Sequence, residues 1–293
     1  AAATGFIQRT RWIYTSTGQA TDRFQYGYDR DGNVLYKNNI LSSAHSELYH
    51  ADGASAGYDL LNRLAAFQRG TLSDSDSDGI PDTVASENRS QSWTLDALGN
   101  WSSQSTDQQT TTRTHNAQNQ ITAISGQTAP TYDNSGNMTG DPDGRCLMYD
   151  AWNRLMSAGT YDPYTGSYAY YSYDALGRRI TDNRSIAGSG GTQSADLYYT
   201  PSWQVVEERQ GSTVMHQYVW SLAYIDALVL RDSNADGDSG TGSLGQSGSG
   251  LEQRLLVQQD ANYNTTALVS TGGAALERYV EERSEEHTSE LQS

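Results

Sequence analysis

The sequence has little cysteine, little lysine and no long apolar run, and each shortage narrows the class of protein. Its single cysteine, Cys146, excludes an internal disulfide. Because a lone cysteine is more often a small buried side chain than a reactive thiol, we expect Cys146 to be buried. No apolar run approaches the roughly 20 residues that a membrane-spanning helix requires, so no such helix is expected in this chain.

Positive charge is scarce as well. The chain has 35 acidic and 19 basic residues, a net charge of −16, and Lys37 is its only lysine. A nucleic acid or an anionic membrane surface binds to a stripe of positive charge, which such a chain does not supply. We therefore expect neither a nucleic acid nor a membrane among its partners.

Aromatic residues, in contrast, are abundant: the chain contains 20 Tyr and 6 Trp, although apolar residues make up only 35% of it. Phe24, Tyr26 and Tyr28 alternate with polar or small residues, and the same alternation returns at Tyr171 and Tyr173. Large amphipathic rings suit cross-strand pairs on wide sheets. Since no helical stripe competes with this alternation, the sequence predicts an all-β fold.

One short pattern occurs seven times: an aromatic or apolar residue, Asp or Asn, two variable residues, Gly or Asn, and a polar residue, usually followed by an apolar one. Asp or Asn can accept hydrogen bonds from backbone N–H groups two residues further on, and Gly or Asn tolerates the positive φ that closes a tight turn. Each copy therefore predicts a strand, a turn and the next strand. The predicted turn residues are Asp29 and Gly32, Asp59 and Asn62, Asp96 and Gly99, Asn116 and Asn119, Asp133 and Gly136, Asp150 and Asn153, and Asp174 and Gly177.

The copies begin at residues 28, 58, 95, 115, 132, 149 and 173, so the period is loose and insertions separate the units. Repeats of this length bury a shared surface by stacking on their neighbours, which predicts an array of β-hairpins. Three stretches rich in Ser, Thr, Gln or Gly, at residues 102–114, 188–194 and 239–250, are expected to form exposed loops.

An acidic insert at residues 71–92 contains the strongest metal-like pattern. Its aspartates are Asp74, Asp76, Asp78 and Asp82. Carboxylates at this spacing are oxygen ligands of the kind that Ca²⁺ takes, and the segment resembles the calcium loops of thrombospondin type 3 and dockerin modules. Ala85 occupies the twelfth position, where an EF-hand has Glu, so a solvated acidic loop is the alternative prediction.

A weaker acidic pattern consists of Asp232, Asn234, Asp236 and Asp238. Either calcium ion would be structural, and no other cofactor is expected. Catalysis has little support, because the histidines are scattered and the repeat aspartates already have a role in the turns. We therefore expect a protein that is not an enzyme.

The repeats resemble the RHS/YD-repeat family, whose Tyr-Asp dipeptide occurs here at residues 28, 58, 132, 149 and 173. The stretch 251–280 is similar to the RHS-associated core that follows such repeats, so the resemblance covers most of residues 20–282. It implies a β-sheet curled into a shell, which encloses a toxic C-terminal domain in bacterial relatives and serves adhesion in animal teneurins. The Asp-Pro-x-Gly-Leu-type motif linked to self-cleavage in many relatives is absent, since Asp141-Pro142-Asp143-Gly144 continues with Arg145.

Four regions are predicted: a YD-repeat region at 1–185, strands with polar inserts at 186–250, core-like hairpins at 251–282, and a tail at 283–293. The start of the chain, Ala1-Ala2-Ala3, has the character of a truncation. The tail breaks the β pattern and resembles the in-frame translation of a sequencing adapter, so we expect it not to be natural coding sequence.

Our first functional hypothesis is a non-enzymatic part of a bacterial shell, secreted or at the cell surface, whose partner is an enclosed C-terminal toxin domain of the polymorphic-toxin kind. The alternative is an adhesion or carbohydrate-binding module, in which exposed aromatics such as Trp203 or Trp220 stack on the sugars of a surface glycan or contact a surface protein. A slice of a sheet has open strand edges, so we also expect poor solubility or oligomers when the chain is expressed alone.

Overall fold

The computed structural model describes residues 6–50, 57–160, 167–185, 192–237 and 250–280. Every regular element in these ranges is a β-strand except one 3-10 turn, η1 (Ser43–His45). The predicted all-β class is therefore confirmed. The tail at 283–293 and most of the polar stretches 188–194 and 239–250 lie outside the described residues.

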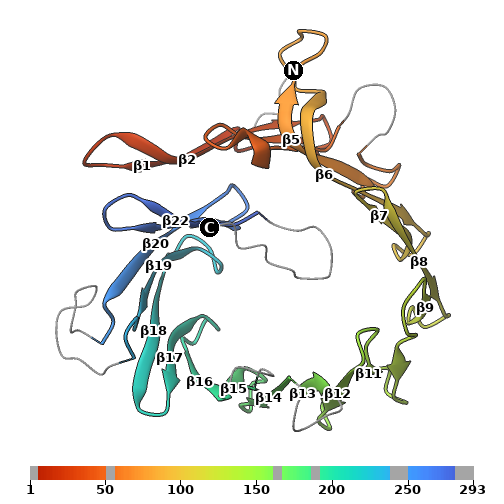
Figure 1. Ribbon diagram of the computed structural model, residues 1–293, viewed down its shortest axis with the longest axis vertical. Coiled ribbons are helices and arrows are strands. Elements are labelled where there is room, and N and C mark those ends of the chain that lie inside the picture. The colour runs from red at the N-terminus through yellow and green to blue at the C-terminus, as the bar shows by residue number, and fades with distance from the viewer. Residues whose placement is uncertain (1–5, 51–56, 161–166, 186–191, 238–249, 281–293) are drawn as a thin grey trace. The chain divides into compact units, whose positions relative to one another are not determined.

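The strands follow one another along the chain as an array of hairpins (Figure 1). The first sheet contains β1 (Arg9–Tyr14), β2 (Gln19–Tyr28), β3 (Val34–Asn39), β4 (Glu47–Leu48), β5 (Ala66–Ser73), β6 (Thr83–Leu95), β7 (Trp101–Thr106), β8 (Gln109–His115) and β9 (Ile121–Ile124). The second contains β10 (Thr131–Tyr132), β11 (Met138–Gly140), β12 (Arg145–Tyr149), β13 (Leu155–Thr160), β14 (Tyr168–Tyr173), β15 (Arg179–Ser185), β16 (Thr192–Tyr199), β17 (Val205–Gln210), β18 (Thr213–Trp220), β19 (Leu228–Ser233), β20 (Gln253–Gln259), β21 (Thr265–Ser270) and β22 (Ala275–Arg278). Each strand pairs with those before and after it in the chain, as stacked repeats require.

The chain divides into two compact units, residues 1–113 with 258–293 and residues 114–257. The core of the first unit is aromatic: Phe67 on β5, Trp93 on β6 and Tyr49, directly after β4, are buried together, and Tyr58 and Trp101 pack against them. The rings of Phe67 and Trp93 stack with their centroids 6.0 Å apart. The abundance of Tyr and Trp thus supplies cross-strand pairs in place of an aliphatic core.

Within each unit, the predicted repeat turns all lie at the same ends of the strands. We call this row of strand ends the turn edge, as distinct from the edge strands of the sheet. In the second unit it carries the connections 133–137, 150–154, 174–178, 200–204 and 221–227. Because antiparallel strands reverse direction at every turn, the intervening connections lie at the opposite edge. The acidic loop 74–82 likewise lies opposite the repeat turns of the first unit.

The stretch 102–114 is not a loop as we expected; it forms nearly all of the hairpin of β7 and β8. The hairpin closes at Asp107 and Gln108, both with positive φ. Threonine is β-branched and suits a strand, so a Ser/Thr-rich segment can form a hairpin with polar faces. The acidic insert 71–92 contains strand residues at both of its ends, because β5 continues to Ser73 and β6 begins at Thr83.

The expectation for Cys146 was wrong as well, since this residue is exposed on β12. Its two cross-strand partners are Gly140 on β11 and Gly159 on β13. Neither glycine has a side chain that could cover the thiol. Exposure of Cys146 therefore follows from the register of three neighbouring strands, which the position of the cysteine in the sequence does not reveal.

Candidate functional site

The repeat turns share one hydrogen-bonding scheme, which the turn at Asp174 shows in full. The backbone N–H of Asp174 donates to the Arg178 carbonyl at 2.9 Å, and the Gly177 N–H donates to the Asp174 carbonyl at 3.0 Å. Asp174 Oδ1 accepts the backbone N–H groups of Leu176 and Arg178, both at 2.9 Å. Gly177 has a φ of +82°. The aspartate thus binds the amides of its own turn, and the glycine supplies the positive φ.

The other predicted turns repeat this scheme. Their closing residues, with φ between +57° and +92°, are Gly32, Asn62, Gly99, Asn119, Gly136 and Asn153. Further turns of the same kind begin at Thr200 and Asp260 on the turn edge, and at Asp141 and Ser270 on the opposite edge. Thr200 and Ser270 accept the backbone N–H four residues on with a hydroxyl in place of a carboxylate, at 3.2 Å. The seven-copy pattern did not include a hydroxyl residue in the Asp position, nor a residue such as Trp203, whose φ is +70°, in the Gly or Asn position.

The polar residue after four of the turns has a role that the sequence did not reveal. Arg178 Nε donates to Asp174 Oδ2 at 2.7 Å, and Arg178 Nη1 donates to the carbonyl of Thr200, the first residue of the next turn, at 3.4 Å. The same relay joins Arg154 to the Asp174 carbonyl, Gln204 to the Ile225 carbonyl and, in the first unit, Arg63 to the Asp96 carbonyl, at 3.2, 2.9 and 2.8 Å. Each of these turns is therefore bonded to the next one along the turn edge.

The aromatic residue that opens a copy bonds to the preceding hairpin. The Tyr173 hydroxyl donates to the Leu155 carbonyl and the Tyr199 hydroxyl to the Arg179 carbonyl, both at 2.7 Å. Burial raises the pKa of both tyrosines, so their hydroxyls remain donors at neutral pH. The Tyr-Asp dipeptide thus joins one residue that holds the previous repeat to one that closes its own turn.

Replacing Gly177 by Val should lower the free energy of unfolding by about 1 kcal/mol or more, because a β-branched residue resists positive φ. Nothing lies within 4 Å of an added Cβ, so the loss would come from backbone strain alone. Gly177→Asn is the matched control, since asparagine closes the turns at Asn62 and Asn153. Urea unfolding of both variants measures the difference, and equal losses would contradict the turn argument.

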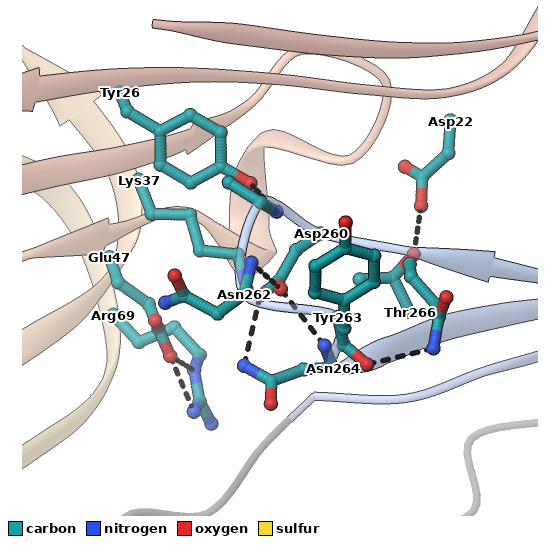
Figure 2. A network of polar contacts seen from close by, with 12 residues as sticks. Asp22, Tyr26, Lys37, Glu47, Arg69, Asp260, Asn262, Tyr263, Asn264 and Thr266 are labelled. Atoms are coloured by element: carbon teal, nitrogen blue, oxygen red, sulfur yellow. Dashed lines mark hydrogen bonds and ion pairs between the residues drawn. The ribbon is translucent and has the colours of Figure 1, made fainter. Parts of the chain in front are cut away.

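The C-terminal strands of the first unit are bonded to its N-terminal strands (Figure 2). Lys37 Nζ, from β3, donates to Asp260 Oδ2 at 2.7 Å, and the two side chains are only 15% and 3% exposed. The same aspartate closes its own turn by accepting the backbone N–H groups of Asn262 and Asn264 at 2.8 and 3.1 Å. The only lysine of the chain is therefore paired with a repeat-type turn. We call this ion pair and its neighbours the clasp.

A second buried carboxylate completes the clasp. Asp22, on β2, is fully buried and accepts the Thr266 hydroxyl of β21 at 2.5 Å (Figure 2). Arg278 donates to the Thr21 carbonyl at 3.1 Å, and one of its nitrogens lies 3.7 Å from Asp22 Oδ1. The clasp therefore joins β2 and β3 to both β21 and β22 through polar groups that face away from water.

The two carboxylates respond differently to burial. Desolvation raises the pKa of Asp22, although the hydrogen bond from Thr266 and the charge of Arg278 act to lower it. Desolvation also acts to raise the pKa of Asp260, but Lys37 and the turn amides outweigh it, and the pKa is lowered. Asp260 is therefore held as the charged partner of Lys37, while Asp22 favours its neutral form more than an exposed aspartate does.

The acidic loop brings three of its four predicted ligands together: oxygens of Asp74, Asp76 and Asp78 lie within 4.8 Å of one another, and all three side chains are exposed. Asp82 instead accepts the Ser75 backbone N–H and hydroxyl at 2.9 and 2.7 Å. The donor set is made of hard oxygens, which fits Ca²⁺. Calcium binding here stays a prediction.

If the loop binds calcium, titration of the chain should show one site in the range of about 10⁻⁴ to 10⁻³ M, as in extracellular modules. The double variant Asp76→Asn and Asp78→Asn should abolish it. Asp143→Asn, an exposed acid in another turn, is the control and should bind like the wild type. Isothermal calorimetry measures all three, and no heat from the wild type would leave the loop as a solvated acidic turn.

In the weaker acidic pattern, Asp232 and Asn234 already form hydrogen bonds within the protein. Asp232 forms two hydrogen bonds with Arg254, at 2.8 and 2.7 Å. Asn234 Oδ1 accepts the Gly237 N–H at 2.6 Å. The fourth predicted ligand, Asp238, lies outside the described residues, so a calcium ion at this loop stays a prediction.

His216 makes a Ser–His hydrogen bond that is partly removed from solvent. Its Nδ1 lies 3.0 Å from the Ser233 hydroxyl, and Ser233 is only 5% exposed. Burial lowers the pKa of His216, while the nearby Glu208 acts to raise it. A buried hydroxyl offers no access to a substrate, so this contact fits packing between β18 and β19 better than catalysis.

No protein-family model and no curated protein matches the sequence. Solved structures do resemble the fold. A structure of the Photorhabdus luminescens Tc holotoxin pore with a TccC3 mutation matches 93% of this chain at 15% identity and a TM-score of 0.65. A crystal structure of TcdB2-TccC3 matches 94% of this chain at 15% identity and a TM-score of 0.66. A crystal structure of TcdB2-TccC3 without the hypervariable C-terminal region matches 91% of this chain at 15% identity and a TM-score of 0.62. The chain spans only 14%, 14% and 13% of those chains.

This likeness concerns the fold, and it supports the hairpin-array architecture. Within the described ranges, no helix is long and apolar enough to cross a membrane.

Proposed function

We propose that the chain is a structural segment of an RHS/YD-repeat shell, whose stacked hairpins form the wall around a C-terminal toxin domain of a longer polypeptide. The observation that carries this proposal is the relay of turn-to-turn hydrogen bonds, because it uses the repeat aspartates and arginines to fix one hairpin to the next. The Tyr-Asp repeats and the fold likeness to Tc toxin chains support it. On this proposal the segment has no catalytic role and belongs to a secreted or surface-exposed bacterial protein.

The first test is long-read sequencing of the same source past codon 282. We expect an Asp-Pro-x-Gly-Leu-type motif followed by an unrelated domain. The longer chain should then protect that domain from protease, with the domain expressed alone as the sensitive control. Continuation into a wall-binding or membrane segment without the motif would contradict enclosure.

An adhesion or carbohydrate-binding module is the second candidate, because Trp152 and Trp203 are 76% and 53% exposed. Exposed rings of this size can stack on sugars. Saturable binding on a glycan array that Trp203→Ala removes would support it. Trp220 is a poor probe, because its indole N–H donates to the Val205 carbonyl at 2.6 Å and its loss would disturb the sheet.

A further inference from the structure

The turn edge of the second unit carries a row of exposed, large apolar side chains. The row consists of Trp152, Leu176, Trp203, Leu222, Tyr224 and Ile225, which are 76%, 64%, 53%, 105%, 49% and 51% exposed. They come from four consecutive connections, 150–154, 174–178, 200–204 and 221–227. All four lie within the described residues, so the whole length of the row is defined.

The relay bonds place these connections side by side. Arg154, Arg178 and Gln204 each donate to a backbone carbonyl of the following connection. Two strands separate successive turns, so the side chains of the row recur about every 10 Å. The row is therefore a continuous surface and not a set of unrelated exposed residues.

The turns themselves do not require apolar residues at these positions. Trp152 and Leu176 occupy the second variable position of their copies. Two other copies carry leucine there, Leu61 and Leu98, and three carry Asp31, Gln118 and Ser135 with the same turn scheme. Folding gains little from an apolar side chain that stays in water. Contiguous exposed apolar surface of this extent is typical of an interaction site.

The two arginines beside the row are already paired. Arg154 and Arg178 pair with Asp150 and Asp174 of their own turns, each at 2.7 Å. The Arg154 guanidinium also lies 5.2 Å from the centre of the Trp152 ring. A partner therefore meets apolar side chains and paired arginines, so two identical rows can approach without bringing unpaired positive charges together.

We propose that this row is a docking surface for a second copy of the chain, with the two rows packed antiparallel about a two-fold axis. Six side chains of this size expose roughly 600 Å² together, close to the ~800 Å² per partner of a standard interface. Because both partners have the same ~10 Å period, side chains of one row can enter the spaces between turns of the other. The inference goes beyond the proposed shell role and does not depend on it.

The test is analytical ultracentrifugation of the full chain over a range of concentrations. We expect a monomer–dimer equilibrium that tightens with added salt, because the two chains each carry a net charge of −16. The double variant Trp152→Ser and Leu176→Ser should weaken dimerisation at least about tenfold. The matched control is Leu98→Ser, which changes the same turn position in the first unit, where Leu98 is 74% exposed, and should leave the equilibrium unchanged.

Several outcomes would overturn the inference. These are a wild type that stays monomeric at every concentration, or equal effects of the row variant and the control. Open-ended oligomers that Ile13→Lys on the edge strand β1 suppresses, and the row variant does not, would assign association to the strand edges. Weaker binding at high salt, or glycan binding that Trp203→Ala removes, would assign the row to another partner. Circular dichroism before and after thermal melting checks that each variant folds.

Discussion

Lys37→Met should lower the free energy of unfolding by about 3 kcal/mol, the lower end of the loss expected when one partner of a buried ion pair is removed. The variant would leave Asp260 charged and only 3% exposed. The turn amides of Asn262 and Asn264 still donate to that carboxylate, which is why we expect the lower end. Urea unfolding followed by tyrosine and tryptophan fluorescence measures the loss.

Two further variants make this test specific. Arg145→Met breaks a comparable pair with Asp141, but Arg145 is 54% exposed and the cost should stay below about 1 kcal/mol. Adding Asp260→Asn to Lys37→Met should restore part of the stability, because the buried charge disappears. A loss for Lys37→Met no larger than that for Arg145→Met would show that the clasp contributes little.

The clasp also predicts a dependence on pH. The pKa of Asp260 is lowered in the folded chain. Its contribution to folding stability is therefore present above the ordinary pKa of an aspartate and is lost as the pH falls through the folded pKa. The effect of Asp22 on stability runs in the opposite direction. Because its folded pKa is raised, its contribution to folding stability is present in acid and is lost as the pH rises through the folded pKa. Asp260→Asn should therefore lose less stability than the wild type between roughly pH 5 and pH 2, and Asp22→Asn should lose more.

Phe67→Ala should cost about 3 to 5 kcal/mol, because it empties the centre of the aromatic core of the first unit. Phe67 is 2% exposed, and its ring centre lies 6.2 Å from that of Tyr49 and 6.0 Å from that of Trp93. Arg69 also lies over the Phe67 ring, at 5.7 Å from its centre, so the variant removes a cation–π contact as well.

Leu98→Ala is the control for Phe67→Ala. Leu98 is 74% exposed on a turn, so the change should stay within about 0.5 kcal/mol of the wild type. Denaturant unfolding of both variants gives the comparison. A loss near that of Leu98→Ala would mean that the aromatic cluster is not the core that its burial indicates.

The sequence predicted the all-β class and the turns well, because both depend on local patterns. Asp174 and Gly177 lie three residues apart, and their roles follow from backbone geometry within that span. The extra turns at Thr200 and Ser270 were missed because a hydroxyl replaces the carboxylate and, at Thr200, because Trp203 takes the place of Gly or Asn. Local chemistry was therefore sufficient wherever the interacting groups are neighbours in the chain.

The clasp was not predictable in the same way. Asp22 and Thr266 are 244 positions apart, and Lys37 and Asp260 are 223 positions apart. Nothing in the composition of either segment marks the other as its partner. The same limit explains the error for Cys146, whose exposure depends on glycines in two other strands, and it explains why the carbonyls bound by Arg154 and Arg178 were not foreseen.

The separation of the two sheet edges has a consequence for how such a chain can change in length. An extra residue between Asp174 and Gly177 would move the polar residue away from the carbonyl it binds and shift the following strand by one, turning its side chains to the wrong face. An insertion after Gly211, on the opposite edge, would break no such turn-to-turn bond, and doubling a loop there costs only about 0.6 kcal/mol. Within each unit, new segments are therefore expected to accumulate at the strand ends opposite the turn edge, while the spacing within the turns that form turn-to-turn bonds is kept.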